Sequence, residues 1–371
     1  MSTVLITGAA GFIGTHARRR LSREGWTVRT FDRADSADRL PTLVDGVDAV
    51  LHLAGVNRTD DDREFDRVNR GLTARLVDAI LGSGGRPAVV FSSSIHARGD
   101  STYGRSKVAG EEELQRLATE SSCPVLVDRL PGVFGAGARP GYNSVVATFC
   151  HRIAHGEGVE IRDAEAEIEI VEVGSVVDRW ISLLADPPGA GYARLPGIDA
   201  YVLTVGDLAG HLGEFARMRR DGFVPDTSDP LRSDLFSTFV SYLDSGALAS
   251  ELQLHSDDRG WLAELIKSPA MGQVFVSSTR PGVTRGNHYH DTKVEKFFVL
   301  RGSAAIRLRG VDDTEVREYR VSGDRPSVVD IPPGYVHNIE NVGDTELIVL
   351  FWANEVFDPE SPDTIPEEVA P

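Results

Sequence analysis

Apolar residues follow two different patterns in the two parts of this 371-residue chain. In the first part, short apolar runs alternate with stretches of helical spacing, and the first four runs span residues 4–6, 27–31, 48–54 and 88–92. Strands separated by helices in this way predict right-handed βαβ units on a parallel sheet. From about Leu254 the helical spacing disappears, and short β-prone runs separated by turn residues favour a barrel of two sheets.

The length of the chain and this change of pattern predict two domains. We expect an α/β domain with a Rossmann-type, doubly wound parallel sheet over residues 1–245, and an all-β domain over residues 254–371. The linker between them is predicted within residues 243–256. The β-prone runs of the second domain are 272–278, 296–300, 304–308, 327–331 and 346–352.

The charge and the cysteines indicate which partners and which compartment to expect. A net charge of −17 at pH 7 disfavours nucleic acid or an acidic membrane surface as a partner. The apolar runs are shorter than the ~20 residues of a membrane-spanning helix, and the first strand begins too early for a signal peptide to precede it. Cys123 and Cys150 are not spaced as a disulfide framework. We therefore expect a cytoplasmic protein that binds neither nucleic acid nor membranes.

A glycine-rich loop follows the first predicted strand. Gly8, Gly11 and Gly14 have the spacing GxxGxxG, which lets the backbone turn tightly and approach a pyrophosphate at the N-terminus of the next helix. This pattern predicts a dinucleotide cofactor. The residues expected at the cofactor belong to this loop and to the end of the third strand: Gly8, Gly11, Phe12, Ile13, Gly14, Leu53 and Ala54.

Two residues at the end of the second strand bear on the choice of cofactor. Asp32 stands where an acid binds the 2′-hydroxyl of a ribose, as in NADH. Arg33, beside it, suits the 2′-phosphate of NADPH instead. The two residues favour different nicotinamide cofactors, and both alternatives stay open at this point.

A serine, a tyrosine and a lysine have the spacing of a carbonyl-reducing site. Tyr103 and Lys107 are four residues apart, so one helical turn places both side chains on the same face. Ser94 ends the fourth strand, at the edge of the sheet where doubly wound folds bind ligands. We expect Ser94 to hydrogen-bond a carbonyl oxygen and Tyr103 to exchange the proton as hydride moves. Lys107 is expected to hold the ribose and to lower the pKa of the Tyr103 phenol.

These motifs together resemble those of the extended short-chain dehydrogenases/reductases that act on nucleotide sugars. The likeness covers residues 1 to about 245 and includes TGAAGFIG, the LHLAG of residues 51–55, Asn69 and the Ser94–Tyr103–Lys107 set. It implies an oxidoreductase with a nicotinamide cofactor. The family usually has asparagine where this chain has Gly132.

The second domain carries two histidines with a metal-ligand spacing. In a strand, His288 and His290 point to the same side of the sheet, so both can face the interior of a barrel. The first motif of the cupin family, GX5HXHX4EX6G, is matched at every position, and the second is matched from its PxG onward. The matching residues are Gly282, His288, His290, Glu295 and Gly302, then Pro332, Gly334, His337 and Asn341.

The resemblance to cupins implies a double-stranded β-helix barrel that binds a divalent metal. Three histidines and one carboxylate would hold it, and such a set suits zinc in first place, with iron, manganese and nickel as alternatives. The implied ligands are His288, His290, Glu295 and His337.

Further motifs are spread over the chain: AGVNR, SSSIHARGDSTYGRSK, YNSVVATFC, GNHYHDTKVEKF and the tail HNIEN…FDPESPDT. Through them the whole chain resembles the bifunctional capsular polysaccharide enzymes that form UDP-2-acetamido-2,6-dideoxy-L-talose. In addition, residues 257–264, DDRGWLAE, are similar to the start of nucleotide-sugar 3,5-epimerases. The resemblance implies a homodimer that acts on a UDP-sugar, a UDP-2-acetamido-2,6-dideoxy-4-hexulose. The cupin half would invert C3, and the first half would then reduce C4. It also favours NADPH, with Arg33 at the 2′-phosphate, while Asp32 leaves NADH open.

Two other functions compete with this one. The first is a C4 reductase whose cupin only dimerises or senses a ligand. The second is a metal-dependent cupin dioxygenase fused to a degenerate nucleotide-binding regulator. The complete Ser94–Tyr103–Lys107 set argues against the dioxygenase.

Overall fold

The computed structural model describes residues 2–370, which form two compact units. One unit extends to Leu212 and includes Ser237–Leu243, and the other comprises Gly213–Phe236 and the chain from Asp244 onward. This division differs from the predicted domains, since Gly213–Phe236 groups with the second unit. The predicted limits at residues 245 and 254 therefore stay a prediction.

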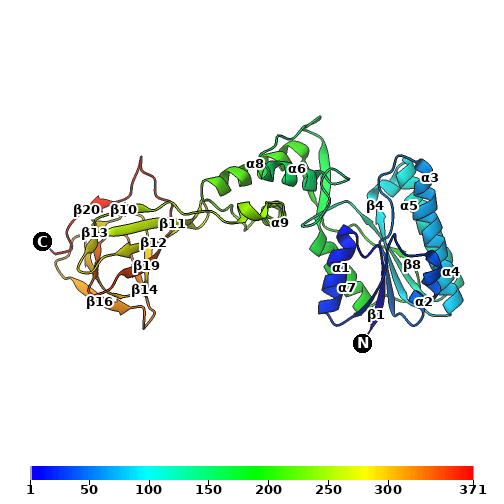
Figure 1. Cartoon of the computed structure of the whole chain (residues 1–371), viewed down its shortest axis with the longest axis horizontal. Helices are drawn as coiled ribbons and strands as arrows, with labels where there is room; N and C mark the ends of the chain where they lie inside the picture. The colour runs from blue at the N-terminus through cyan, green and yellow to red at the C-terminus, as the bar shows by residue number, and fades with distance from the viewer. Residues whose placement is uncertain (1, 371) are drawn as a thin grey trace. The chain divides into compact units, whose positions relative to one another are not determined.

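The first unit contains a parallel sheet with the strand order β2-β1-β3-β4-β5-β8 (Figure 1). The order reverses beside β1, so the carboxyl ends of β1 and β3 border the crevice in which such sheets bind ligands. The strands are β1 (Thr3–Thr7), β2 (Thr27–Phe31), β3 (Ala49–His52), β4 (Ala88–Ser94), β5 (Pro124–Leu130) and β8 (Gly191–Arg194). The predicted Rossmann-type sheet is confirmed.

Helices cover both faces of this sheet, and the alternation of side chains along each strand determines which face each residue supports. In β1, Val4 and Ile6 pack in one core cluster and Leu5 packs in the other. The first cluster contains residues of α1 (Phe12–Arg23) and α7 (Val173–Ala185). The second contains residues of α2 (Leu40–Val44), α4 (Gly71–Ser83) and α5 (Thr102–Glu120). Both faces are therefore apolar, as a buried parallel sheet requires.

Shorter elements complete the first unit and lead into the second. A small sheet has the order β6-β7-β9, with β6 at Gly132–Phe134, β7 at Glu167–Glu172 and β9 at Tyr201–Thr204. The remaining helices and turns are η1 (Ala37–Arg39), α3 (Asp62–Phe65), η2 (Asp66–Arg70), η3 (Ile95–Arg98), α6 (Val145–Ala154), α8 (Val205–Arg220), α9 (Pro230–Val240) and η4 (Ser245–Leu248). In the described part of the chain, no helix combines the length and the apolar character that a membrane crossing needs.

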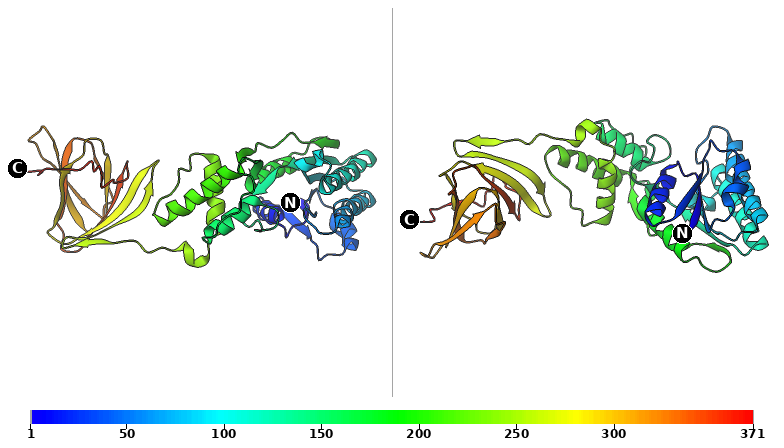
Figure 2. Two further views of the ribbon diagram at one scale, coloured as in Figure 1. Left: turned by 90° about the horizontal axis from the view of Figure 1, so that it is seen from above. Right: turned by 60° about the horizontal axis from the view of Figure 1, so that its bottom comes forward.

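In the second unit, the strands from β10 onward form a barrel of two antiparallel sheets, visible from two sides in Figure 2. One sheet has the order β10-β11-β12-β19-β14-β17 and the other β16-β15-β18-β13-β20. The strands are β10 (His255–Asp257), β11 (Gly260–Ser268), β12 (Gly272–Thr279), β13 (Thr284–Tyr289), β14 (Glu295–Arg301), β15 (Ser303–Gly310), β16 (Arg317–Ser322), β17 (Val328–Ile331), β18 (Tyr335–Asn341), β19 (Leu347–Ala353) and β20 (Ile365–Pro366).

Apolar side chains from both sheets form one core inside this barrel. Phe297 of β14 and Phe351 of β19 are paired in the register and pack edge to face, with ring centroids 4.7 Å apart. Ile306 of β15 and Ile339 of β18 belong to the same cluster from the opposite sheet. This arrangement is the cupin-like barrel that the second half of the sequence predicts.

Candidate functional site

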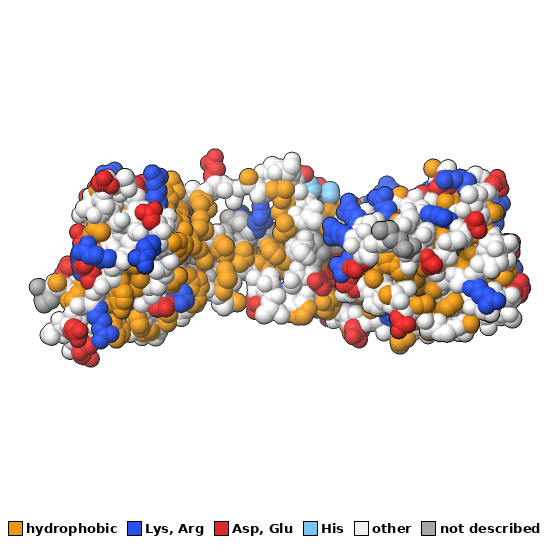
Figure 3. Space-filling model, turned by 90° about the horizontal axis from the view of Figure 1, so that it is seen from below, with side chains coloured by type: hydrophobic (Ala, Val, Ile, Leu, Met, Phe, Trp, Pro, Cys, Tyr) orange, Lys and Arg blue, Asp and Glu red, His pale blue; other side chains and the backbone are white. Residues whose placement is uncertain are grey.

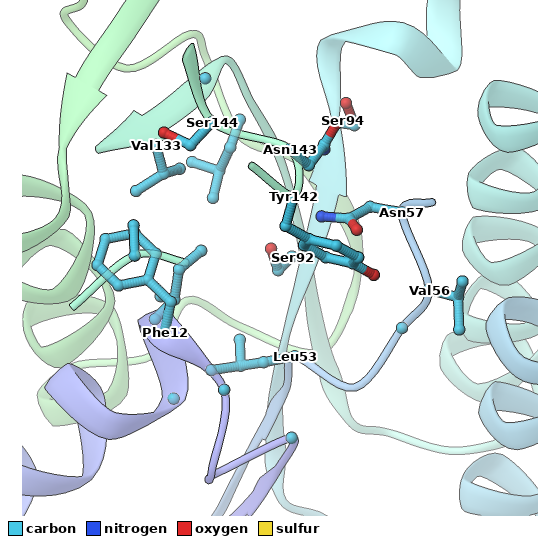
Figure 4. Close-up of a pocket in the computed structure, with 18 of the residues that line it drawn as sticks. Phe12, Leu53, Val56, Asn57, Ser92, Ser94, Val133, Tyr142, Asn143 and Ser144 are labelled. Carbon is cyan, nitrogen blue, oxygen red and sulfur yellow. The ribbon is translucent and has the colours of Figure 1, made fainter. Parts of the chain in front are cut away.

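A cavity of about 650 Å³ lies at the carboxyl ends of β1, β3 and β4 in the first unit. Its lining includes most of the predicted cofactor residues and the three predicted catalytic residues: Gly8, Gly11, Phe12, Ile13, Gly14, Leu53, Ser94, Tyr103 and Lys107. Figure 4 shows several of these side chains around the cavity, with Phe12, Leu53 and Ser94 labelled. The position agrees with the reversal of strand order beside β1.

The glycine loop brings backbone against backbone at its two ends. Gly8 has φ of 72°, and a Cβ there would lie 2.8 Å from the nitrogen of Ala54. A Cβ at Gly14 would lie 2.1 Å from the carbonyl oxygen of Gly8. Ala54 is therefore in contact with the loop, although its side chain does not line the cavity. Larger residues at either glycine would displace the loop that is predicted to hold the pyrophosphate.

Asp32 and Arg33 lie outside this cavity. The Asp32 carboxylate accepts a hydrogen bond of 2.7 Å from the backbone nitrogen of Ala10, so it supports the glycine loop. Both residues line a second cavity of about 700 Å³, to which Arg67 and Arg70 also contribute. Arg33 is almost fully exposed and lies 3.5 Å from Glu64.

The helix α5 begins in a way that brings Tyr103 and Lys107 to the sheet. The Ser101 hydroxyl accepts a hydrogen bond of 3.0 Å from the Gly104 nitrogen and so caps the helix. Lys107 is only 6% exposed, and its ammonium donates to the Ser92 carbonyl at 2.9 Å. The structure thus brings Ser94, Tyr103 and Lys107 to one cavity, as the spacing predicted.

The expected effect of Lys107 on the Tyr103 phenol stays a prediction, because burial sets the direction of the pKa shift in this structure. We expected the Lys107 ammonium to lower the pKa of the phenol. In the structure, burial raises the pKa of Tyr103, and the hydrogen bond with Ser94 opposes this only partly. Burial also lowers the pKa of Lys107 to about 8, against the opposing charge of Glu111. At neutral pH Tyr103 therefore keeps its proton and Lys107 keeps its charge.

Asn69 connects the loop after β3 to the helix that carries Tyr103. Its amide oxygen accepts from the Val56 nitrogen at 2.8 Å, and its amide nitrogen donates to the Val56 carbonyl at 2.9 Å. The same nitrogen donates to the Ser106 hydroxyl at 2.8 Å, and that hydroxyl donates to the Tyr103 carbonyl at 2.7 Å. The amide therefore connects the loop at Val56 to the helix α5 at Ser106.

Some lining residues were not assigned a role from the sequence. His96 follows Ser94 at the mouth of the cavity, and its ring lies 6.3 Å from that of Tyr103. Tyr142 projects toward the cavity beside Asn57 (Figure 4). Arg58 donates to the Tyr142 carbonyl at 2.8 Å and so joins two loops at the rim. No periodicity marks these residues, because they lie on loops that are distant in sequence.

The four predicted metal ligands of the second unit also come together. One ligand atom from each of His288, His290, Glu295 and His337 lies within 4.8 Å of the others. In the register His288 of β13 stands opposite His337 of β18, next to an irregularity at Gly286. The Glu295 carboxylate is 3.4 Å from His290 Nε2 and 3.3 Å from His337 Nε2.

The buried donor atoms of this cluster suit a divalent metal. Burial, together with the neighbouring histidines, lowers the pKa of His288 to about 4. Burial alone would raise the pKa of Glu295, but the nearby His290 and His337 outweigh burial and lower the pKa to about 2. Within residues 2–370, the buried Nε2 atoms of His290 and His337 have no hydrogen-bond partner. Three imidazole rings around a carboxylate are a donor set that zinc takes.

The family of the chain follows from comparison with known proteins. Residues 4–189 match the NAD dependent epimerase/dehydratase family, and residues 255–365 match the polysaccharide biosynthesis C-terminal domain. The chain belongs to the NAD dependent epimerase/dehydratase family.

Particular relatives share both parts of the chain. It is 40% identical over 362 residues to UDP-2-acetamido-2,6-beta-L-arabino-hexul-4-ose reductase of Pseudomonas aeruginosa, a match covering 97% of each protein. Its structure is similar to the crystal structure of the capsular polysaccharide assembling protein CapF from Staphylococcus aureus. The TM-score is 0.90 at 39% sequence identity, covering 99% of this chain and 100% of that one. The predicted resemblance to capsular polysaccharide enzymes is confirmed.

A shorter relative is the spore coat polysaccharide biosynthesis protein SpsL of Bacillus subtilis. The identity is 30% over 128 residues, which is 32% of this chain and 85% of the relative.

Proposed function

We propose that this protein is a nucleotide-sugar 4-ketoreductase that depends on NAD(P)H and serves the synthesis of a surface polysaccharide. The observation that carries this proposal is the meeting of Ser94, Tyr103 and Lys107 in one cavity with the glycine loop. The name of the Pseudomonas aeruginosa relative supports the substrate class, a UDP-2-acetamido-2,6-dideoxy-4-hexulose. The name of the Staphylococcus aureus protein supports a role in capsular polysaccharide synthesis.

Each of the three side chains has its own role in the reduction of a C4 ketone. The bound nicotinamide supplies the hydride. The Ser94 hydroxyl holds the ketone oxygen, and Tyr103, protonated at neutral pH, gives its proton to that oxygen as C4 is reduced. The Lys107 ammonium stabilises the negative charge that remains on the phenolate. The product is the C4 alcohol.

We further propose that the barrel inverts C3 of the same substrate before reduction. The C4 ketone acidifies the C3 proton, so a base can remove it and return it on the other face. A zinc ion on His288, His290, Glu295 and His337 would act as a Lewis acid toward the substrate oxygen.

Two lysines were candidates for the base, and their surroundings differ. Lys293 is 4% exposed, with its ammonium 3.4 Å from the Asp363 carbonyl and 3.8 Å from Glu355. Lys296 is about half exposed and pairs with Asp330 on the neighbouring strand. We therefore favour Lys293.

The remaining assignments concern the cofactor, the assembly and the compartment. We propose NADPH with Arg33 at the 2′-phosphate, and Arg67 on the same cavity supports this choice over NADH. We infer a homodimer, since the barrel unit exposes large apolar side chains such as Leu265 and Met271 and carries a band of apolar surface in Figure 3. The free, buried Cys123 and Cys150 agree with the cytoplasm.

The same apolar band favours a second candidate function, a C4 reductase whose barrel only dimerises. The two functions differ in the stereochemistry of the product. The protein is incubated with UDP-2-acetamido-2,6-dideoxy-4-hexuloses in deuterated water with NADPH or NADH, and the product is analysed by NMR. Deuterium at C3 with inverted configuration supports both activities. Reduction with C3 unchanged supports the second candidate, and the absence of reduction with either cofactor contradicts both.

A further inference from the structure

The tail of the chain reaches the loop between two of the metal ligands through Asp363. One carboxylate oxygen of Asp363 accepts a hydrogen bond of 2.8 Å from the Asp291 nitrogen. The other oxygen accepts from the nitrogens of Thr292 and Lys293, both at 2.9 Å, and from the Thr292 hydroxyl at 3.0 Å. One side chain thus binds every residue from 291 to 293, directly after His290.

The backbone carbonyl of Asp363 makes a separate contact with the ligand itself. His290 Nδ1 is hydrogen-bonded to this carbonyl oxygen. Because a carbonyl oxygen only accepts, Nδ1 carries a proton, which leaves Nε2 as the ring nitrogen that can bind a metal. That Nε2 is the buried atom without a partner in the described chain, and it faces Glu295 at 3.4 Å.

The neighbouring tail residues give Asp363 a fixed position. In β20, Ile365 and Pro366 pair with Tyr289 and His288 of β13, the strand that carries the ligands. Three residues further on, Val369 is fully buried, and its carbonyl accepts from Arg309 at 2.9 Å.

The predicted ligand His337 has a different kind of Nδ1 contact from His290. His337 Nδ1 is hydrogen-bonded to the Tyr335 carbonyl at 3.0 Å, within its own strand. The orientation of His337 is therefore local to β18, whereas that of His290 depends on a residue 73 positions away in sequence.

We infer that Asp363 is a positioning residue for the metal site: its carboxylate shapes the loop of residues 291–293 and thereby holds its own backbone carbonyl against His290. The inference rests on the proposed metal site and adds a part of the chain outside both cupin motifs. The carboxylate accepts three backbone N–H bonds and one hydroxyl bond from residues 291–293. Hydrogen bonds of this kind to a charged group are roughly twice as strong as neutral ones.

The test is the zinc affinity of the metal-free, full-length protein, measured by competition with a chromophoric chelator. Loss of such an outer contact weakens metal binding by roughly 10–100-fold, and we expect this for Asp363→Ala. Asp363→Asn keeps one acceptor oxygen, so its zinc affinity should lie between those of the wild type and Asp363→Ala. Thr292→Val removes a single hydroxyl and should change the affinity only a few fold.

A matched control lies in the same tail. Asp358 accepts from the Glu360 nitrogen at 2.9 Å, so Asp358→Asn alters a nearby carboxylate with a purely local bond. It should bind zinc like the wild type. Unfolding of each metal-free variant and its binding of NADPH report whether both units remain folded.

The possible outcomes distinguish a failure of the inference on Asp363 from a failure of the proposed metal site. A wild-type protein that binds no zinc overturns the metal site itself. If the wild type binds zinc and folded Asp363→Ala binds it equally well, Asp363 has only a structural role and the inference is wrong. Weak binding by Asp363→Ala, with Asp358→Asn unchanged, supports it.

Discussion

Lys107 and Glu111 lie one turn apart on the buried face of α5 and hold two consecutive residues of β4. Lys107 donates to the Ser92 carbonyl at 2.9 Å, and Glu111 accepts from the Ser93 hydroxyl at 2.6 Å. Arg129 donates to both oxygens of Glu111, at 2.8 and 2.7 Å. The negative charge of Glu111 favours the protonated form of Lys107, against the effect of burial on its pKa.

Glu111→Gln should therefore move the pH dependence of the reduction. Lys107, with its pKa of about 8, acts as a cation, so the rate falls as pH rises through that value. Removal of the Glu111 charge lowers this pKa further, and the decline should begin at lower pH. The measurement is kcat/KM for the 4-keto sugar from pH 6 to 9, with the exposed Glu112→Gln as the control. An unmoved profile would show that Glu111 serves only to bind Arg129.

Tyr103→Phe should abolish reduction while cofactor affinity changes only a few fold. A positioned proton donor contributes roughly 10²–10⁴-fold to the rate, and the phenol is the group that we assign to this role. NADPH oxidation at saturating substrate measures the loss, and fluorescence titration measures binding. Activity above a tenth of the wild-type value would contradict the assignment.

His52 should make the first unit sensitive to acid. It is fully buried between Thr7 and Thr73, at 2.7 and 2.8 Å, and burial and Lys107 lower its pKa from 6.5 to about 3. The unfolded chain takes up a proton below pH 6.5 and the folded chain does not, so stability is lost as the pH falls from 6.5 toward 3. At pH 5 the loss is about 2 kcal/mol relative to pH 7.5.

His52→Gln removes this titration and keeps a donor and an acceptor at the site. Urea unfolding of both proteins at pH 7.5 and pH 5 gives the comparison. We expect the wild type to lose about 2 kcal/mol more than the variant, and equal losses would show that His52 is not the group responsible.

Arg33→Ala should discriminate between the two nicotinamides. If the guanidinium binds a 2′-phosphate, its loss weakens NADPH by roughly the 1.5–3 kcal/mol of a charged hydrogen bond and leaves NADH nearly unchanged. Isothermal titration with each cofactor measures both. Equal losses for the two cofactors would make Asp32 the discriminating residue and NADH the partner.

The two fold classes were predictable from the sequence because the apolar residues of each half follow a regular spacing. Some individual strands were not predictable. In β16 the first four residues, Arg317 to Arg320, are all exposed, so this edge strand shows no apolar run. In β18, His337 and Asn338 replace the apolar residues of an ordinary core strand. Strands at a sheet edge or at a ligand site depend on their neighbours rather than on their own hydrophobicity.

The site was predictable where its residues are close in sequence. His288, His290 and Glu295 belong to one motif, and Tyr103 and Lys107 to one helical turn. Asp363 contacts the loop after His290, and Arg129 contacts Glu111, each from another segment of the chain. A single sequence contains no signal for such contacts. The position of Arg33 outside the main cavity was equally hidden, since strand ends do not show in which direction a long side chain lies.

The last prediction tests whether the barrel inverts C3 while the first unit reduces C4. If the barrel inverts C3, solvent deuterium should enter the 4-keto sugar at C3 with no nicotinamide present, because enolisation needs no hydride. Tyr103→Phe should leave this exchange unchanged, since the phenol lies in the first unit. His290→Ala should slow it by roughly the 10²-fold or more that a displaced catalytic geometry costs.

Lys296→Ala is the matched control for the exchange, because Lys296 lies on the ligand strand but pairs outward with Asp330. NMR of the C3 proton over time, with zinc supplied, gives the rate for each variant. Exchange that stops in Tyr103→Phe and continues in His290→Ala would transfer the epimerase activity to the first unit. If no exchange occurs in the zinc-loaded wild type, while NADPH still reduces the sugar with C3 retained, the barrel does not catalyse epimerisation.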